Sequence, residues 1–65
     1  MQDFVARMRT ESDALKIKID KALEFMCTDI FKGLTTDEKS MLHSQVHAMQ
    51  AYYEILSMRI RFYAN

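Results

Sequence analysis

The stretch that decides the fold is Asp29-Ile30-Phe31-Lys32-Gly33-Leu34-Thr35, which holds the strongest break in a chain of 65 residues. Gly33 is the single glycine and there is no proline, so no other segment carries a comparable turn signal. Thr35 followed by Glu38 is a capping-box pattern, which predicts that a helix begins just after the break. The sequence therefore predicts one turn between two helical segments.

Apolar residues recur every three or four positions on both sides of this break. Before the break they form a first seam, in which only Ser12 is polar: Met1, Val5, Met8, Ser12, Leu15, Ile19, Ala22 and Met26. After the break they form a second seam: Leu42, Val46, Met49, Tyr53, Leu56, Ile60 and Tyr63. The two seams predict an all-α single domain over residues 1–65, with helices over about 3–28 and about 36–63 and a loop over about 29–35. We expect an antiparallel αα-hairpin, with Ile30, Phe31 and Leu34 packing at its loop end.

The second helix carries more apolar residues than a hairpin can cover. Beside the second seam runs another line at the same spacing, here called the second stripe: Met41, Gln45, Ala48, Tyr52, Ile55, Arg59 and Phe62. A chain this short that is 49% hydrophobic has little interior in which to bury such residues. We expect the hairpins to assemble into a homo-oligomeric helical bundle with the second helix near its centre. The alternative is a monomer with an exposed apolar surface.

Gln45, Tyr52 and Arg59 interrupt the second stripe at intervals of seven residues. Polar groups in a buried seam must be hydrogen-bonded, because each unpaired group costs a few kcal/mol. Two interpretations stay open. The three residues either fix the register of the assembly or contact a ligand between subunits.

The arginines provide a second indication of a ligand. There are four of them: Arg7, Arg9, Arg59 and Arg61. An antiparallel hairpin brings all four to one end, together with Tyr52, Tyr53 and other aromatic residues. Guanidinium groups bind phosphate and aromatic rings stack on bases, so this combination suits a nucleotide. Salt bridges between subunits and an aromatic core would explain the same pattern. The candidate ligand-binding residues are Arg59, Arg61, Tyr52, Tyr53, Gln45, Arg7 and Arg9.

Several function classes find no support in the sequence. No serine has an evident base beside it, and His43 with His47 gives only two of the three or more ligands of a metal site. We expect no enzyme activity, no catalytic residue, no metal and no cofactor. The formal net charge is zero and neither helix has a continuous basic face, which argues against DNA or RNA as a partner.

The longest uncharged run, Ser40 to Tyr53, has 14 residues and is too short to span a membrane. The single cysteine, Cys27, cannot form an internal disulfide. These features predict a cytoplasmic protein with no membrane partner.

The second helix, with the turn before it, resembles a family of very small phage-encoded proteins from crAss-like and other phages. The likeness covers roughly residues 13–60. It is carried by Phe31-x-x-Leu34, Glu38, Leu42, Gln45, Met49, the run Ala51-Tyr52-Tyr53-Glu54-Ile55-Leu56, and Arg59-Ile60. A weaker, architectural likeness is to the short helical hairpins of phage anti-CBASS and anti-Thoeris sponges, which hold cyclic nucleotide signals between subunits without cleaving them.

These resemblances imply a non-catalytic anti-defence protein that sequesters a cyclic nucleotide immune signal, in the cytoplasm of the host cell if the chain is phage-encoded. Two alternatives remain. The chain could instead be an inhibitor or adaptor that docks an apolar helix face on a host protein. It could also be a purely structural oligomer.

Overall fold

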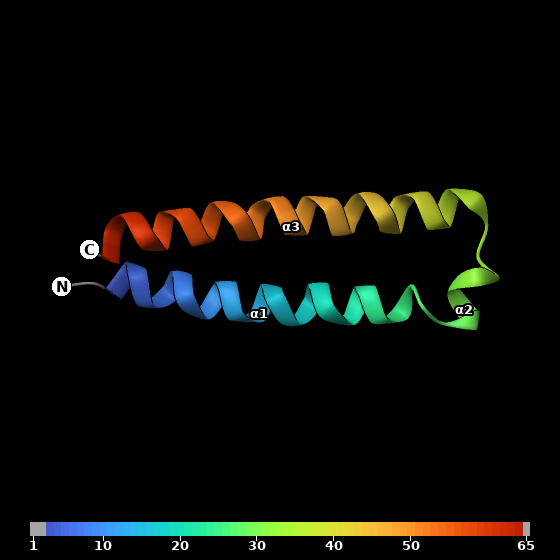
Figure 1. The fold of residues 1–65 in the computed structure, drawn as a ribbon, viewed down its shortest axis with the longest axis horizontal. Coiled ribbons are helices and arrows are strands. Elements are labelled where there is room, and N and C mark those ends of the chain that lie inside the picture. Colours follow the sequence, from blue (N-terminus) through green and yellow to red (C-terminus); the bar gives the residue numbers. More distant parts are fainter. Residues whose placement is uncertain (1–2, 65) are drawn as a thin grey trace.

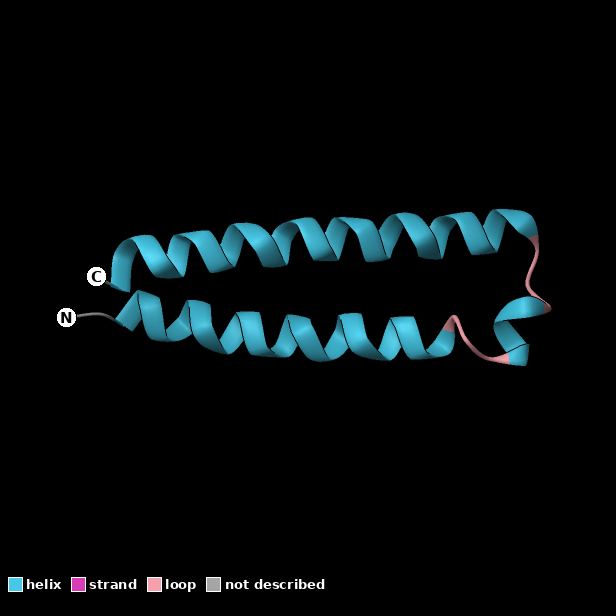
Figure 2. Ribbon diagram, viewed as in Figure 1, coloured by secondary structure: helices cyan, strands magenta, loops and turns pink. Residues whose placement is uncertain are grey.

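The chain is an αα-hairpin. The computed structural model describes residues 3–64 and contains α1 (Asp3–Phe25), α2 (Asp29–Lys32) and α3 (Thr36–Ala64). The two long helices run antiparallel and side by side, and α2 lies at the end where the chain reverses (Figure 1). Colouring by secondary structure shows only helix and loop in this part of the chain (Figure 2). The predicted pair of long helices in contact is confirmed.

The first and second seams form the core between α1 and α3. The buried apolar residues are Val5, Met8, Leu15, Ile19, Val46 and Leu56, and Leu56 is fully buried. Met49, Tyr53 and Ile60 are half-buried and pack against this core. Ser12 is buried at its seam position, as predicted. Met1, assigned to the first seam, lies outside the described residues.

The open end of the hairpin departs from the seam pattern at one position. Tyr63 ends the second seam but is exposed, and its ring packs edge-on against Phe4 at 5.1 Å between centroids. Phe62 packs edge-on against Tyr63 at 4.9 Å. Beyond Val5 and Ile60, the described ends of α1 and α3 therefore meet through exposed aromatic rings.

The predicted capping box begins α3. The backbone N–H of Glu38 donates to Thr35 Oγ1 at 3.1 Å, and the backbone N–H of Thr35 donates to Glu38 Oε1 at 2.9 Å. These bonds satisfy two N–H groups that have no partner inside the helix. The hydrogen bonds from Thr35 also hold the pKa of Glu38 below its usual range, because they favour the ionised carboxylate.

The turn differs in detail from a simple loop. α1 ends at Phe25, whereas the seam pattern predicts about residue 28. Thr28 has an extended backbone, and its Oγ1 accepts a hydrogen bond from the N–H of Phe31 at 3.3 Å. Thr28 thus caps a new single turn, α2, instead of continuing α1, since a threonine hydroxyl competes with the helical ladder.

Phe31 fills the loop end of the hairpin. Its ring lies edge-on to Phe25 at 6.1 Å and to His43 at 5.9 Å, and Lys39 Nζ lies 5.8 Å from its centroid. Leu34 is half-buried, but Ile30 is 70% exposed. The prediction that Ile30 packs here is wrong. In the single turn of α2, neighbouring residues point about 100° apart, so Phe31 faces inward and Ile30 faces outward.

The hairpin is a thin rod, measuring 49 × 15 × 12 Å. Its radius of gyration is 14.9 Å, against about 11 Å for a compact chain of this length. Its accessible surface of 5044 Å² exceeds the about 4,300 Å² typical of a compact protein of this mass. Among the described helices, none has the length and apolarity needed to cross a membrane.

Candidate functional site

The second stripe is exposed along its whole length on α3. Its large apolar members project into solvent, and Phe62 is 75% exposed. Gln45, Ala48 and Arg59 are exposed as well. α1 covers only the second seam, so a single hairpin leaves the stripe uncovered. The excess of apolar surface predicted from the sequence is therefore present.

Tyr52, at the centre of the second stripe, is linked to α1. Its hydroxyl donates a hydrogen bond of 2.5 Å to Glu11 Oε2. This bond to the carboxylate raises the pKa of Tyr52, with smaller contributions from desolvation and from the charge of Glu11, while the positive charge of Arg59 acts in the opposite direction. Tyr52, Glu11 and Arg59 therefore form one local group of a ring, an anion and a cation.

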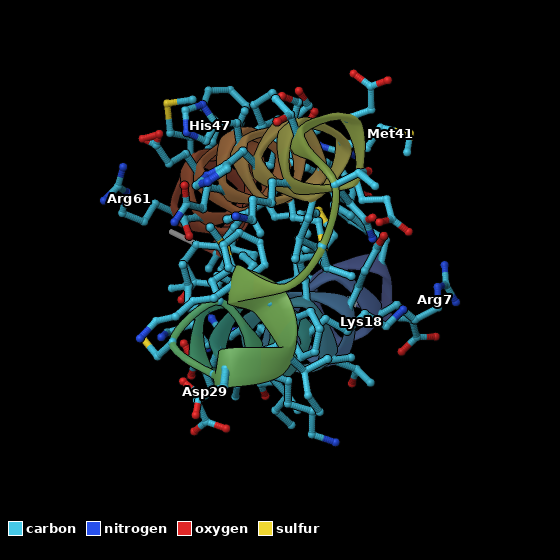
Figure 3. All side chains as sticks on the ribbon, turned by 90° about the vertical axis from the view of Figure 1, so that its right-hand side faces the viewer. Arg7, Lys18, Asp29, Met41, His47 and Arg61 are labelled. Atoms are coloured by element: carbon cyan, nitrogen blue, oxygen red, sulfur yellow. The ribbon has the colours of Figure 1, made fainter. Side chains whose placement is uncertain are left out.

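The four arginines lie at the open end of the hairpin but on two different sides of it. A view along the rod shows Arg7 and Met41 projecting to one side and Arg61 to the other (Figure 3). Arg59 follows Met41 by about five full helical turns, so it lies on the same face of α3 as Met41. Arg7, Tyr52 and Arg59 thus share the side that carries the second stripe.

Arg61 and Arg9 lie in separate depressions. Arg61 lines an open groove of about 460 Å³ with Tyr53, Ile55 and Met58 among its neighbours. Arg9 lines a smaller one of about 250 Å³ beside Ala64. One ligand bound to a single hairpin cannot touch all four arginines, so a shared contact requires a second chain.

A third groove runs between the helices, with a volume of about 380 Å³. Its lining includes the apolar side chains of Ile19 and Leu23 and the ring of Tyr53, together with polar Gln50 and Glu54. Lys16, also in its lining, pairs with Asp20 at 2.8 Å, which raises the pKa of Lys16. The cation of this groove is thus already paired within α1.

Sequence reasoning did not include Glu11 among the candidate site residues. The signal that could have found it is the hairpin register: once the seams face each other antiparallel, Glu11 of α1 falls at the level of Tyr52 of α3.

Within residues 3–64, no three His, Cys, Asp or Glu side chains gather in a way that could hold a metal ion. His43 packs against the ring of Phe31. The free thiol of Cys27 is exposed near the turn.

The chain was compared with known proteins at three levels. No curated protein and no solved structure matches it significantly. One protein family does: the family model described as Sequestin matches residues 2–62, which is nearly the whole hairpin. By this match the chain belongs to the Sequestin family.

Proposed function

We propose that the chain is a non-catalytic, phage-type anti-defence protein that sequesters a nucleotide signal in pockets between copies of itself. The name of its family suggests a sequestering role. The observation that carries the proposal is the group formed by Tyr52, Glu11 and Arg59 on the exposed second stripe. Arg7 projects to the same side of the hairpin (Figure 3).

Each member of this group has a counterpart in a nucleotide. The guanidinium groups of Arg59 and Arg7 match phosphate oxygens. The ring of Tyr52 offers a stacking face for a base, and exposed Gln45 offers an amide to a base edge. The Glu11 carboxylate accepts hydrogen bonds, so it suits a ribose hydroxyl or an exocyclic amine.

A second copy is needed to close the pocket. Small-molecule sites bury about 70–90% of their ligand, and the depressions on one hairpin are open grooves. A neighbouring hairpin would supply the missing wall. Tyr53 and Arg61 line a groove that reaches only Ile55 of the second stripe, and Arg9 lines a separate one, so these three residues would touch the ligand only where a further copy presents that side.

Calorimetry with a panel of cyclic di- and trinucleotides tests the proposal. We expect at least one ligand to bind with a Kd below about 10 μM, about 7 kcal/mol, and to be recovered intact. Arg59→Gln is expected to weaken binding at least about tenfold, the loss of about 1.4 kcal/mol.

Arg61→Gln is the matched control, since Arg61 is the same residue two positions away on another side. Loss of binding in Arg59→Gln alone places the pocket on the second stripe. Loss of binding in both variants places the pocket where the second-stripe side of one chain meets the opposite side of its neighbour. Failure of the whole panel to bind, or full affinity in both variants, contradicts the proposal.

A second candidate is an inhibitor that docks on a host protein. The observation that favours it is the outer surface of α3, where Met58 and Phe62 are more than half exposed. Affinity capture from host lysate separates the two candidates. A sequestering protein recovers nucleotide without a stoichiometric protein, whereas an inhibitor recovers a stoichiometric protein. A purely structural oligomer would recover neither, and Tyr52→Ala would alter only its assembly.

A further inference from the structure

The order of polar and apolar residues along the second stripe is nearly the same from either end. Tyr52 stands in the middle, with one polar residue on each side, Gln45 and Arg59. The apolar members lie at nearly equal distances on the two sides of Tyr52, to within one residue: Met41 and Phe62 at the ends, Ala48 and Ile55 near the centre. A surface with this order can pack against a copy of itself, because a twofold axis places the same patch on both partners.

We propose that two copies pair antiparallel through α3, with the twofold axis at Tyr52. Met41 then lies opposite Phe62 of the second copy, and Ala48 lies opposite Ile55. A small residue facing a large one lets the two helices approach closely without overpacking.

The polar residues of the stripe fit the same arrangement. Gln45 lies opposite Arg59 of the second copy, where the amide oxygen accepts a hydrogen bond from the guanidinium group. Parallel pairing would instead bring two Arg59 side chains together, and arginine cannot lose its charge to relieve the repulsion. The chemistry of the stripe therefore selects the antiparallel orientation.

The size of the surface is also adequate. A pair centred on Tyr52 overlaps over about residues 40–64, which is about 36 Å of helix. A face 15 Å wide then contributes about 540 Å² from each partner, and the total of about 1,100 Å² exceeds the about 1,000 Å² expected of a specific interface. Met41, Ile55 and Phe62 on this face are all exposed in the single hairpin. A second copy covers them along their full length.

This pairing rests on the self-association in the proposed function and completes its pocket. Arg59 of one copy comes beside Gln45 of the other, and the two Tyr52–Glu11 hydrogen bonds lie close to the axis. Each pocket would thus be built from both chains, with Arg7 of the adjoining α1 at its edge. None of the three grooves described above is lined by Tyr52, Glu11 or Arg59, so the proposed pocket would form only where the two stripes meet.

Sedimentation of two isoleucine variants tests the surface. Ile55→Glu places a charge on the second stripe, and the matched control Ile17→Glu places one on α1 outside the stripe, at similar exposures of 47% and 55%. We expect the wild type and Ile17→Glu to sediment as two chains of 7.7 kDa or an even multiple, and Ile55→Glu as single chains. Helical circular dichroism checks that both variants stay folded. An associated Ile55→Glu, or a single-chain wild type, overturns the proposal.

Cross-linking tests the register, in a Cys27→Ser background. Chains with Ala48→Cys are mixed with chains with Ile55→Cys and treated with a short bis-maleimide. We expect a covalent dimer in the mixture, and little in either sample alone, because residues of like number lie about 10 Å apart along the antiparallel pair. A covalent dimer from Ala48→Cys alone, or no covalent dimer in the mixture, overturns the proposed antiparallel register.

The two proposals fail separately. If the pairing forms and no nucleotide binds, the proposed function fails and the interface stands. If a chain that does not pair through α3 binds nucleotide, the interface fails and the sequestering function stands.

Discussion

Gly33 ends α2 without using the conformational freedom of glycine. Its φ is −82° and its ψ is −5°, in the right-handed helical region. A Cβ added there would lie 3.6 Å from the carbonyl oxygen of Ile30, an ordinary contact. We expect Gly33→Ala to raise the free energy of unfolding by about 0.4–1 kcal/mol, because alanine has fewer conformations to lose on folding.

Urea unfolding of wild type and Gly33→Ala measures this difference. Gly33→Pro serves as the opposite control, because proline would remove the Gly33 N–H that donates to the carbonyls of Asp29 and Ile30. A destabilised Gly33→Ala would show that the turn needs glycine after all.

Glu38 makes stability depend on pH. Hydrogen bonds from Thr35 lower its pKa in the folded chain below the ordinary value of 4.5. A carboxyl whose pKa is lowered by folding stabilises the fold above its unfolded pKa, and that contribution is lost as pH falls through the folded pKa. We therefore expect the free energy of unfolding to fall as pH drops below about 4.5.

Glu38→Gln separates this group from the other carboxylates. Glutamine keeps an acceptor for the Thr35 N–H but cannot titrate, so the pH dependence of unfolding should become shallower in this variant. Identical pH profiles for wild type and Glu38→Gln would show that the capping box makes no titrating contribution.

At the scale of the helices, the seams carry the fold. Leu56 is fully buried between α1 and α3, whereas Met58 on the same helix is more than half exposed. We expect Leu56→Ala to cost about 2–5 kcal/mol, the transfer and cavity cost of a buried leucine. For a hairpin this small, that loss is enough to unfold a large fraction of the chain.

Met58→Ala is the matched control and should change the free energy of unfolding by no more than about 0.5 kcal/mol. Thermal unfolding followed by circular dichroism compares the two. A Leu56→Ala variant as stable as Met58→Ala would mean that the core lies elsewhere than between the two seams.

The helices also show which features of the fold could be predicted from the sequence. The alternating three- and four-residue spacing of the two seams was enough to predict which faces meet, and the Thr35 cap was predicted with its partner. The end of α1 was not, because Thr28 can either extend a helix or cap a new one, and periodicity alone does not distinguish the two.

Less of the candidate site than of the fold could be predicted from the sequence. That the arginines reach one end follows from the antiparallel order, but the split between Arg7 and Arg61 depends on the angular position of each residue around its helix (Figure 3). The bond between Tyr52 and Glu11 depends on the axial register of two helices. Both are three-dimensional quantities that composition and spacing do not give.

At the scale of the whole molecule, the central feature is a rod that exposes the second stripe. Its accessible surface is larger than a compact protein of its mass would show, and more of its exposed large apolar side chains lie on α3 than on α1. Association of the rods would cover this surface and would also create the closed pockets that a single hairpin lacks. We therefore expect ligand capture to depend on self-association.

Native mass spectrometry of the wild-type chain at micromolar concentration, with a panel of cyclic nucleotides added, tests this link most directly. We predict particles whose mass is a multiple of 7.7 kDa and which carry intact nucleotide. A particle of 7.7 kDa that neither associates nor retains any nucleotide would contradict the account.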